Sequence, residues 1–303
     1  MGLKYGCLVE DVITGIAIHC RGWKSIYMKP KREGFMGMAG TTLDQNLVQH
    51  KRWSEGNLQI MLSKYNPAWY GFGRLHIGFV AGYSIYGLWG FNCFATLCYA
   101  IIPSLYLLKG VPLFPPVSSF WFYPFLFVAV ADSACSFAEL VSIGGTSLGW
   151  LNLQRMWLYK RVSSYLFATV DALLRLIGFP GSGFIVSAKV SDDEALERYG
   201  REMIEFGVDS PMVTIISWIA ALNFVSFAVA VARATVFGSL GREAAEVMAL
   251  QIALSGAVVA VNLPLYAAAL FRKDGGRLPS SVTVKSVFAA VTFAVGFGLE
   301  FKV

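Results

Sequence analysis

Charged residues are scarce in this sequence. Asp, Glu, Lys and Arg together make up 15% of its 303 residues, whereas about 25% is usual for a soluble protein. Hydrophobic residues make up 56%. This composition excludes an intrinsically disordered chain, a collagen-like fibre and an ordinary soluble enzyme. It predicts a protein that crosses a membrane several times.

Several other signals are missing. The five cysteines show no zinc-finger spacing, so we expect them to be buried free thiols. Residues 1–20 do not resemble a secretory signal peptide, because Glu10 and Asp11 stand where its apolar core would lie. The net charge of +6 is typical of a membrane protein with basic loops, and we expect no nucleic-acid partner.

Five segments are long and apolar enough to span a membrane as helices of about 20 residues. They lie at residues 84–108, 120–147, 211–232, 247–271 and 282–299. The predicted fold class is therefore a polytopic α-helical membrane protein with five transmembrane helices.

Two acidic residues fall inside the second of these segments. Asp132 and Glu139 are one heptad apart, so they share one face of that helix. A charged group within a membrane needs a partner or water. These carboxylates therefore either line a translocation channel or make a contact inside the helix bundle.

Residues 150–179 combine apolar residues at helical spacing with five charged residues. This pattern favours an amphipathic helix in the membrane interface over a sixth span. The Lys and Arg counts agree: ten in 1–83 and seven in 148–210, against one in 109–119 and two in 233–246. Because basic loops stay in the cytoplasm, we predict that the amino-terminal segment is cytoplasmic.

A short helix is predicted near the start of the chain. Glu10 and Asp11 precede apolar residues at helical spacing, and Gly22 follows them. Acidic residues are common in the first turn of a helix because the helix dipole favours them there. The pair is therefore either structural or a carboxylate presented to a substrate as a general base.

A second helix is predicted from about Leu43, after the capping sequence Thr-Thr-Leu-Asp at 41–44. Gln49, Arg52 and Trp53 then share one face of this helix. A guanidinium group suits phosphate oxygens and a flat indole suits a sugar ring. The same face also suits a helix that lies against a membrane surface.

A third motif lies in a glycine-flanked segment at 181–192, which contains Phe184, Val186, Ser187 and Lys189. A loop with a hydroxyl and an ammonium group could close over a phosphate group. A plain connecting loop is the other interpretation.

Longer stretches of sequence accompany these motifs. They are Glu-Asp-Val-Ile-Thr-Gly at 10–15, His-Cys-Arg-Gly-Trp-Lys-Ser-Ile-Tyr at 19–27, Ser-Lys-Tyr-Asn-Pro-Ala-Trp-Tyr-Gly at 63–71 and Pro-Ser-Leu-Tyr-Leu-Leu-Lys-Gly-Val-Pro-Leu-Phe-Pro at 103–115. Together they resemble the processive family 2 glycosyltransferases, and most closely the plant cellulose synthase superfamily and its cellulose synthase-like E and G branches. The resemblance extends over essentially all of the chain.

The resemblance implies roles for individual residues. Asp11, with Glu10 beside it, matches the aspartate that acts as general base, although Val9 replaces the Thr of the family motif. Gln49 and Trp53 match acceptor-binding positions of the Gln-x-x-Arg-Trp motif, and Arg52 matches its diphosphate-binding position.

The resemblance also implies that 181–192 is a cytoplasmic gating loop. Phe184 and Val186 match its motif, and Ser187, in place of the usual Thr, and Lys189 would contact the diphosphate. Residues 1–70 would be the carboxyl-terminal remnant of a GT-A type α/β catalytic domain, and 71–303 a transmembrane channel region. The aromatic residues that could line this channel include Trp89, Phe91, Tyr99 and Tyr106.

The metal-binding Asp-x-Asp motif of the family is not found in residues 1–70, whose only aspartates are Asp11 and Asp44. The resemblance implies Mg²⁺ or Mn²⁺ for the intact enzyme, and no metal site is expected in this chain. We therefore expect it to be the carboxyl-terminal part of a longer protein and to be inactive alone.

The function implied is that of a UDP-sugar-dependent hexosyltransferase of plant cell-wall biogenesis. It would extend a β-glucan acceptor and pass the polysaccharide through the membrane. Two alternatives stay open: transfer of a single sugar to a small hydrophobic acceptor, and a non-catalytic partner subunit of a synthase. Membrane lipids are implied partners, and a homo- or hetero-oligomer is left open. The branch resemblance favours the Golgi membrane, with the plasma membrane and the endoplasmic reticulum as alternatives.

Overall fold

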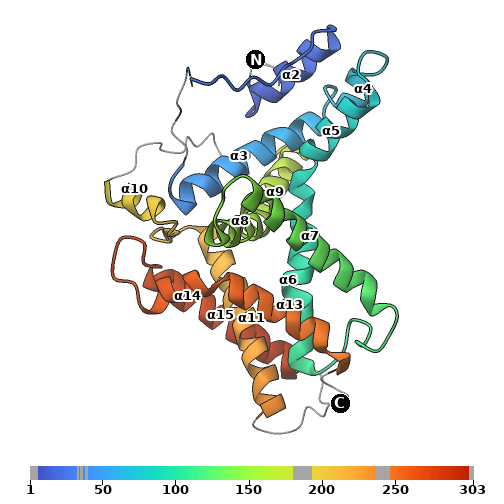
Figure 1. The fold of residues 1–303 in the computed structure, drawn as a ribbon. Helices are drawn as coiled ribbons and strands as arrows, with labels where there is room; N and C mark the ends of the chain where they lie inside the picture. Colours follow the sequence, from blue (N-terminus) through green and yellow to red (C-terminus); the bar gives the residue numbers. More distant parts are fainter. Residues whose placement is uncertain are drawn as a thin grey trace. The chain divides into compact units, whose positions relative to one another are not determined.

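The computed structural model describes residues 6–32, 34, 37, 40–179, 193–235 and 246–299. All regular elements in these residues are helices (Figure 1). They are α2 (Glu10–Cys20), α3 (Leu43–Met61), α4 (Pro67–Tyr70), α5 (Ile77–Gly87), η1 (Trp89–Phe91), α6 (Asn92–Lys109), α7 (Phe122–Ser142), α8 (Ser147–Tyr159), η2 (Lys160–Ser164), α9 (Tyr165–Leu176), α10 (Asp193–Gly200), α11 (Pro211–Thr235), α13 (Ala249–Val261), α14 (Leu263–Leu270) and α15 (Ser280–Leu299).

The chain forms two compact units. The first comprises Met1–Phe94 and Lys160–Asp192, and the second comprises Ala95–Tyr159 and Asp193–Val303. The first unit thus includes a segment that follows the first predicted span. The division into a catalytic segment, 1–70, and a channel region, 71–303, stays a prediction.

In the first unit, α2 and α3 begin where the sequence predicts. Glu10 and Asp11 occupy the first turn of α2, and Gly22 follows its end with a φ of +87°, a conformation that suits glycine. Thr42 caps α3 and forms a capping box with Gln45: the Gln45 N–H donates to Thr42 Oγ1, and the Thr42 N–H donates to Gln45 Oε1. Both helix starts are confirmed.

Two ion pairs join α3 to α9. Lys51 Nζ lies 2.7 Å from Asp171 Oδ2, and Arg175 Nε lies 2.8 Å from Glu55 Oε1. The Glu55 side chain is only 4% exposed. Because burial removes it from water, the pKa of Glu55 is raised, and the charge of Arg175 opposes that shift.

The segment predicted as one amphipathic helix, 150–179, is divided into three elements. A π-helix, η2, separates α8 from α9, and α9 belongs to the first unit through its contacts with α3. None of the candidate spans lies in this segment of the described chain. Its position in the membrane interface stays a prediction.

Four helices are long and apolar enough to cross a membrane, and a bent pair is a possible fifth. The four are Trp89–Lys109, Phe122–Ser142, Pro211–Thr235 and Ser280–Phe297. The bent pair is α13 with α14, whose axes differ in direction by 52°. Each of these helices overlaps one of the five predicted segments, and most of the helix ends lie within a few residues of the predicted ends. The membrane-helical character is therefore confirmed, and the count of five spans stays a prediction.

The bend between α13 and α14 has a local cause. Pro264, in the first turn of α14, has no backbone N–H to continue the hydrogen bonds of α13. The buried Arg155 of α8 donates from Nε to the Val261 carbonyl at 2.8 Å, so a side chain satisfies the end of α13.

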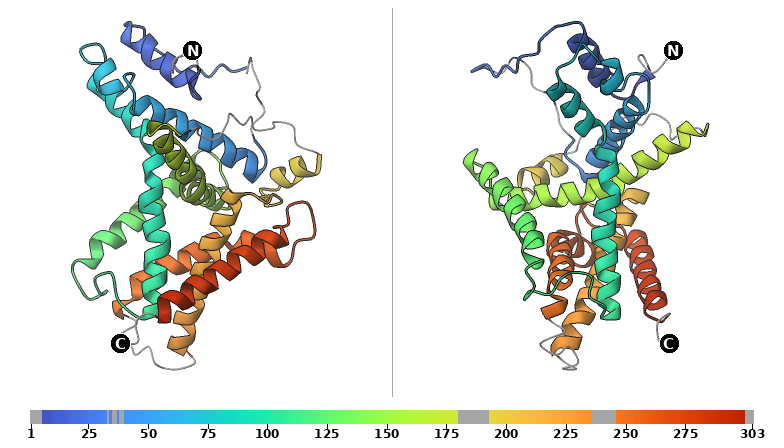
Figure 2. Two further views of the ribbon diagram at one scale, coloured as in Figure 1. Left: turned by 180° about the vertical axis from the view of Figure 1, so that it is seen from behind. Right: turned by 90° about the vertical axis from the view of Figure 1, so that its right-hand side faces the viewer.

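In the second unit, α11 and α15 run in the same direction (Figure 2). Ser286 Oγ donates to the Thr214 carbonyl at 3.2 Å, and further along both helices the rings of Trp218 and Phe293 lie 5.6 Å apart. The residue numbers of the contacting positions increase together along α11 and α15, so the two helices are parallel. The chain must therefore run back in the opposite direction between the end of α11 and the start of α15.

The intervening α13–α14 pair supplies that return. Ser255 Oγ donates to the Asn223 carbonyl and Tyr266 Oη donates to the Ala220 carbonyl. The contacting residue numbers decrease along α11 as they increase along α13 and α14, so this pair is antiparallel to α11. This geometry supports the interpretation of the bent pair as one crossing, which leaves α11 and α15 pointing the same way across a membrane.

Some expectations differ from the structure. Among the described residues of 1–70 no strand is found, so the α/β character of a GT-A remnant is not seen there. Asp132 and Glu139 are exposed on α7, and no ion pair to either is found in the described ranges. The cysteines are free, but only Cys7 and Cys93 are buried. The prediction that all five are buried is wrong, because Cys98 and Cys135 lie on outward faces of apolar helices.

Candidate functional site

The apolar face of α2 packs against α3 in the first unit. Ile13 and Ile16 of α2 form a buried cluster with Ile60 of α3, and the half-buried Trp53 packs against this cluster. Contacts of the α2 helix thus bring the predicted base segment and the predicted acceptor-binding Trp into one cluster.

A glycine allows this close approach. Gly56 faces Val9, the N-cap residue of α2, and a Cβ atom added to Gly56 would lie 2.9 Å from Val9 Cγ2. Val9 itself is 2% exposed. The replacement of the family's Thr by Val therefore places an apolar side chain in an apolar contact.

Asp11 is exposed in the first turn of α2, one residue after the helix begins. Its carboxylate acts on a residue of α5: burial raises the pKa of the Tyr86 phenol, a side-chain hydrogen bond with Asn57 lowers it, and the charge of Asp11 raises it. The exposed carboxylate therefore lies within electrostatic range of Tyr86 of α5.

The three motif residues of α3 are all half-buried. Gln49, Arg52 and Trp53 fall within the helix, at the spacing that places them on one side. His50 presents its ring to Trp53 edge to face, with centroids 5.0 Å apart at 77°. The Trp53 indole is thus held from one side by the cluster and from another by His50.

A small cavity adjoins Trp53. It has a volume of about 60 Å³. We call this cavity the Trp53 chamber. The residues that line it are His50, Trp53, Ser54, Asn57, Tyr86, Trp89 and Tyr165. They come from α3, α5, η1 and α9, all within the first unit.

The chamber is polar but uncharged at neutral pH. Burial, together with the charge of Lys160, lowers the pKa of His50 to about 4, so its imidazole is neutral at pH 7. Burial and the neighbouring Arg161 lower the pKa of Lys160 itself to about 8. Burial also raises the pKa of Tyr165 to about 12, so its hydroxyl stays protonated.

The remaining predicted site residues, Phe184, Val186, Ser187 and Lys189, lie outside the described residues, as does the whole of 181–192. Their roles in a gating loop stay predictions. Among the residues that the structure does describe, no three His, Cys, Asp or Glu side chains gather in a way that could hold a metal ion.

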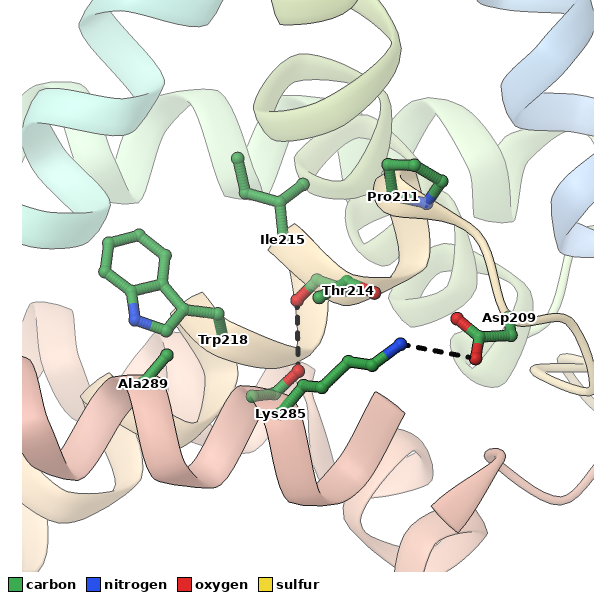
Figure 3. Close-up of a pocket in the computed structure, with 8 residues that line it drawn as sticks. Asp209, Pro211, Thr214, Ile215, Trp218, Lys285 and Ala289 are labelled. Atoms are coloured by element: carbon green, nitrogen blue, oxygen red, sulfur yellow. Dashed lines mark hydrogen bonds and ion pairs between the residues drawn. The ribbon is translucent and has the colours of Figure 1, made fainter. Parts of the chain in front are cut away.

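A larger groove lies in the second unit, between α11 and α15 (Figure 3). Its volume is about 540 Å³. At one end Lys285 Nζ lies 3.6 Å from Asp209 Oδ2. Thr214 and Ser286 are joined beside this ion pair, and Trp218 lies further along the groove. The groove therefore has a polar end and an apolar end.

Sequence patterns do not single out the hydroxyl residues of the chamber. Ser54 lies beside the Arg-Trp pair but carries no motif of its own, and Tyr165 is 112 positions beyond Trp53 in the sequence. Trp89 is noted in the sequence only as one of several aromatic residues of the first span. Only the packing of α9 and η1 against α3 brings these residues together.

Comparison with known proteins identifies the family. The family model described as cellulose synthase matches residues 1–298. Cellulose synthase-like protein E2 of Oryza sativa subsp. japonica is 46% identical over 286 residues, which are 94% of this chain and 38% of that protein. Cellulose synthase-like protein E1 of the same organism is 43% identical over 296 residues, 97% of this chain and 40% of the relative.

A less similar relative is named for another reaction. Quillaic acid 3-O-glycosyltransferase CSL1 of Saponaria officinalis is 29% identical over 269 residues, 88% of this chain and 37% of that protein. The chain thus spans about two fifths of the length of the curated relatives it matches.

Proposed function

Because this chain belongs to the cellulose synthase family and fits its E branch, we propose that it forms the carboxyl-terminal part of a glycosyltransferase. The whole protein would transfer a sugar from a UDP-sugar to the end of a growing β-glucan and pass the polysaccharide through the membrane. The observation that carries this proposal is the α2–α3 cluster, which joins the segment of Asp11 to Trp53.

In the proposed reaction Asp11 acts as the general base. Its carboxylate accepts the proton of an acceptor hydroxyl, while the oxygen of that hydroxyl bonds to the anomeric carbon of the UDP-sugar. The bond from the anomeric carbon to the diphosphate breaks on the opposite face, so the configuration inverts and UDP leaves. The exposed position of Asp11 leaves its carboxylate accessible to such an acceptor.

Trp53 and Gln49 would hold the acceptor sugar. An indole face suits the apolar face of a pyranose ring, and the contacts of Trp53 with His50 and the α2–α3 cluster fix the plane of that indole. Arg52, one residue before Trp53, would pair with the leaving diphosphate, to which a guanidinium group donates two parallel hydrogen bonds. Ser187 and Lys189 of the proposed gating loop would add further donors.

The base is tested in the full-length protein that contains this chain. We expect Asp11→Asn to abolish sugar transfer, because an amide cannot accept the proton, while binding of the UDP-sugar persists. Turnover is followed with a radiolabelled UDP-sugar, and donor binding is followed by equilibrium dialysis.

Asp44→Asn is the matched control, since Asp44 also occupies the first turn of a helix but lies outside the proposed machinery. It should retain turnover. Wild-type turnover by Asp11→Asn would rule out Asp11 as the base, and equal losses in both variants would indicate a structural effect of removing an acid.

A second function is favoured by one relative and one groove. The relative from Saponaria officinalis is named for glycosylation of quillaic acid, and the groove between α11 and α15 offers an apolar surface that ends in polar groups. Transfer of a single sugar to a small amphipathic acceptor is therefore the alternative. Product analysis separates the two: a polymer that a β-glucanase digests supports the first, and a single-sugar conjugate supports the second.

Part of the first unit carries exposed apolar side chains. Trp23, Ile26 and Tyr27 are 72%, 89% and 90% exposed, in a segment that also carries lysines. Exposed apolar patches mark contact surfaces, and we propose that this segment packs against the rest of the catalytic domain in the whole protein. The chain alone would then be inactive; detectable transfer by the purified 303-residue chain would contradict this.

A partner-subunit role would instead show as co-purification with an active synthase.

A further inference from the structure

The Trp53 chamber contains two buried hydroxyl groups without a hydrogen-bond partner in the described part of the chain. Ser54 is 5% exposed and Tyr165 is 2% exposed, and neither Ser54 Oγ nor Tyr165 Oη is bonded there. Buried hydroxyls nearly always have a partner, because leaving them unsatisfied destabilises the fold. Two such groups at one cavity leave hydrogen-bonding capacity that either bound water or a ligand group that both donates and accepts hydrogen bonds can use.

The size of the chamber limits this group. Its volume of about 60 Å³ is well below the roughly 300–1,000 Å³ of sites that enclose a whole small molecule. A pyranose ring is too large, whereas a single hydroxymethyl group fits. Gly90 keeps the space open, since a Cβ atom there would lie 2.8 Å from Ser54 Oγ and 3.1 Å from Thr169 Oγ1.

The chamber's charge narrows the choice further. The described residues that line it are aromatic or carry hydroxyl, amide and neutral imidazole groups. A carboxylate or phosphate entering this space finds no cation in the lining itself; Lys160, which acts on His50, and Arg161, which acts on Tyr165, lie outside the lining. A hydroxyl group loses little, because Ser54 and Tyr165 replace its hydrogen bonds to water.

We propose that the chamber is a specificity pocket that receives the exocyclic hydroxymethyl group of a hexopyranose stacked on Trp53. This inference rests on the proposed function, in which Trp53 holds the acceptor. The hydroxymethyl group projects from the edge of the ring, and Trp53 itself forms part of the chamber wall. In the proposed binding mode the sugar lies on the indole with this group turned toward the chamber.

The pocket selects hexoses over pentoses. A pentopyranose such as xylose has no exocyclic carbon, so it leaves both hydroxyls unsatisfied by the ligand. Sites built to bond a ligand hydroxyl discriminate strongly against analogues that lack it. Because a pentose leaves room for water to enter the chamber, we expect a moderate preference of about tenfold.

The test compares two tetrasaccharides that differ only in this group. The β-1,4-linked tetrasaccharides of glucose and of xylose are titrated by isothermal calorimetry against the detergent-solubilised full-length protein that contains this chain. We expect the glucose tetrasaccharide to bind about tenfold more tightly. In the double variant Ser54→Ala and Tyr165→Phe, its affinity should fall to that of the xylose tetrasaccharide, whose own affinity should not change. Tyr70→Phe, outside the chamber, is the control for loss of a tyrosine hydroxyl.

The remaining outcomes separate this pocket from the proposed function. If both sugars bind equally and Trp53→Ala abolishes binding, the acceptor site stands and the specificity pocket is refuted. If neither sugar binds, both are refuted. The thermal midpoint of the double variant should not fall, because it removes unsatisfied groups. A fall with an unchanged sugar preference would mean that the hydroxyls serve the fold through bound water, which also refutes the pocket.

Discussion

The contact between Gly56 and Val9 determines where the start of α2 lies on α3. A methyl group at position 56 would lie 2.9 and 3.1 Å from the two γ-methyl carbons of Val9 and 3.0 Å from Leu8 Cβ. Such distances are too short, so Gly56→Ala must push α2, with Asp11 in its first turn, away from α3. Alanine is favoured over glycine within a helix by about 1 kcal/mol, but overpacking a core costs about 1–3 kcal/mol. We expect Gly56→Ala to be destabilising by about 1 kcal/mol.

Shortening Val9 relieves that clash. Val9→Ala alone removes two buried methyl groups, each worth about 0.8 kcal/mol plus a cavity term, so it should cost about 2 kcal/mol. In the double variant the removed methyl groups make room for the new one, and only the Leu8 contact stays tight. The double variant should therefore cost about 1.5 kcal/mol less than the sum of the two single variants.

Thermal unfolding of the detergent-solubilised chain measures these costs, and sugar transfer by the full-length protein measures their effect on the site. Gly56→Ala should lower turnover more than UDP-sugar binding, because it displaces the base segment, and Val9→Ala should partly restore turnover to it. Strict additivity of the two substitutions would refute the packing of α2 on α3, and with it the way in which the proposed site is assembled.

Three further perturbations test the first and second units. The pKa of His50 is lowered from 6.5 to about 4, so the unfolded chain binds a proton before the folded chain does as the pH falls. The free energy of unfolding should therefore drop between pH 6.5 and 4, by about 2 kcal/mol at pH 5. His50→Gln should remove this pH dependence in thermal unfolding. Arg175→Met leaves the buried Glu55 carboxylate without its ion-pair partner, although Gln59 Nε2 still donates to it, and should cost about 2 kcal/mol. Adding Glu55→Gln should restore most of this loss, and an equal loss in the double variant would contradict a role for the charge. Arg155→Met should destabilise the bend after α13 because the Val261 carbonyl loses its donor, and faster amide hydrogen exchange confined to α13 and α14 would confirm this, while unchanged exchange there would contradict it.

Local features of the sequence predict the helix starts well. Thr42 and Gln45 form a capping box because the residues involved are three apart, and the acids of α2 stand where the helix dipole favours them. The spans are predicted because long apolar runs are recorded directly in the sequence. Pro264 explains why the fourth span is bent, yet a proline within an apolar run does not reveal the angle.

Tertiary contacts decide what the sequence leaves open. The segment 150–179 has the periodicity of one amphipathic helix, but the ion pairs of Asp171 and Arg175 with α3 draw its second half into the first unit. Burial of the hydroxyls of Ser54 and Tyr165, which have no partner in the described part of the chain, follows from the packing of α5, η1 and α9 against α3. No periodicity or spacing records such a juxtaposition.

The central claim is that this chain supplies the base and the acceptor platform of an inverting glycosyltransferase. The most direct measurement is the proton NMR spectrum of the product that the full-length protein forms from a UDP-α-sugar. A β-linked product, made by the wild-type protein and missing with Asp11→Asn, is the predicted result. An α-linked product, or the same β-linked product from Asp11→Asn at the wild-type rate, would contradict the claim.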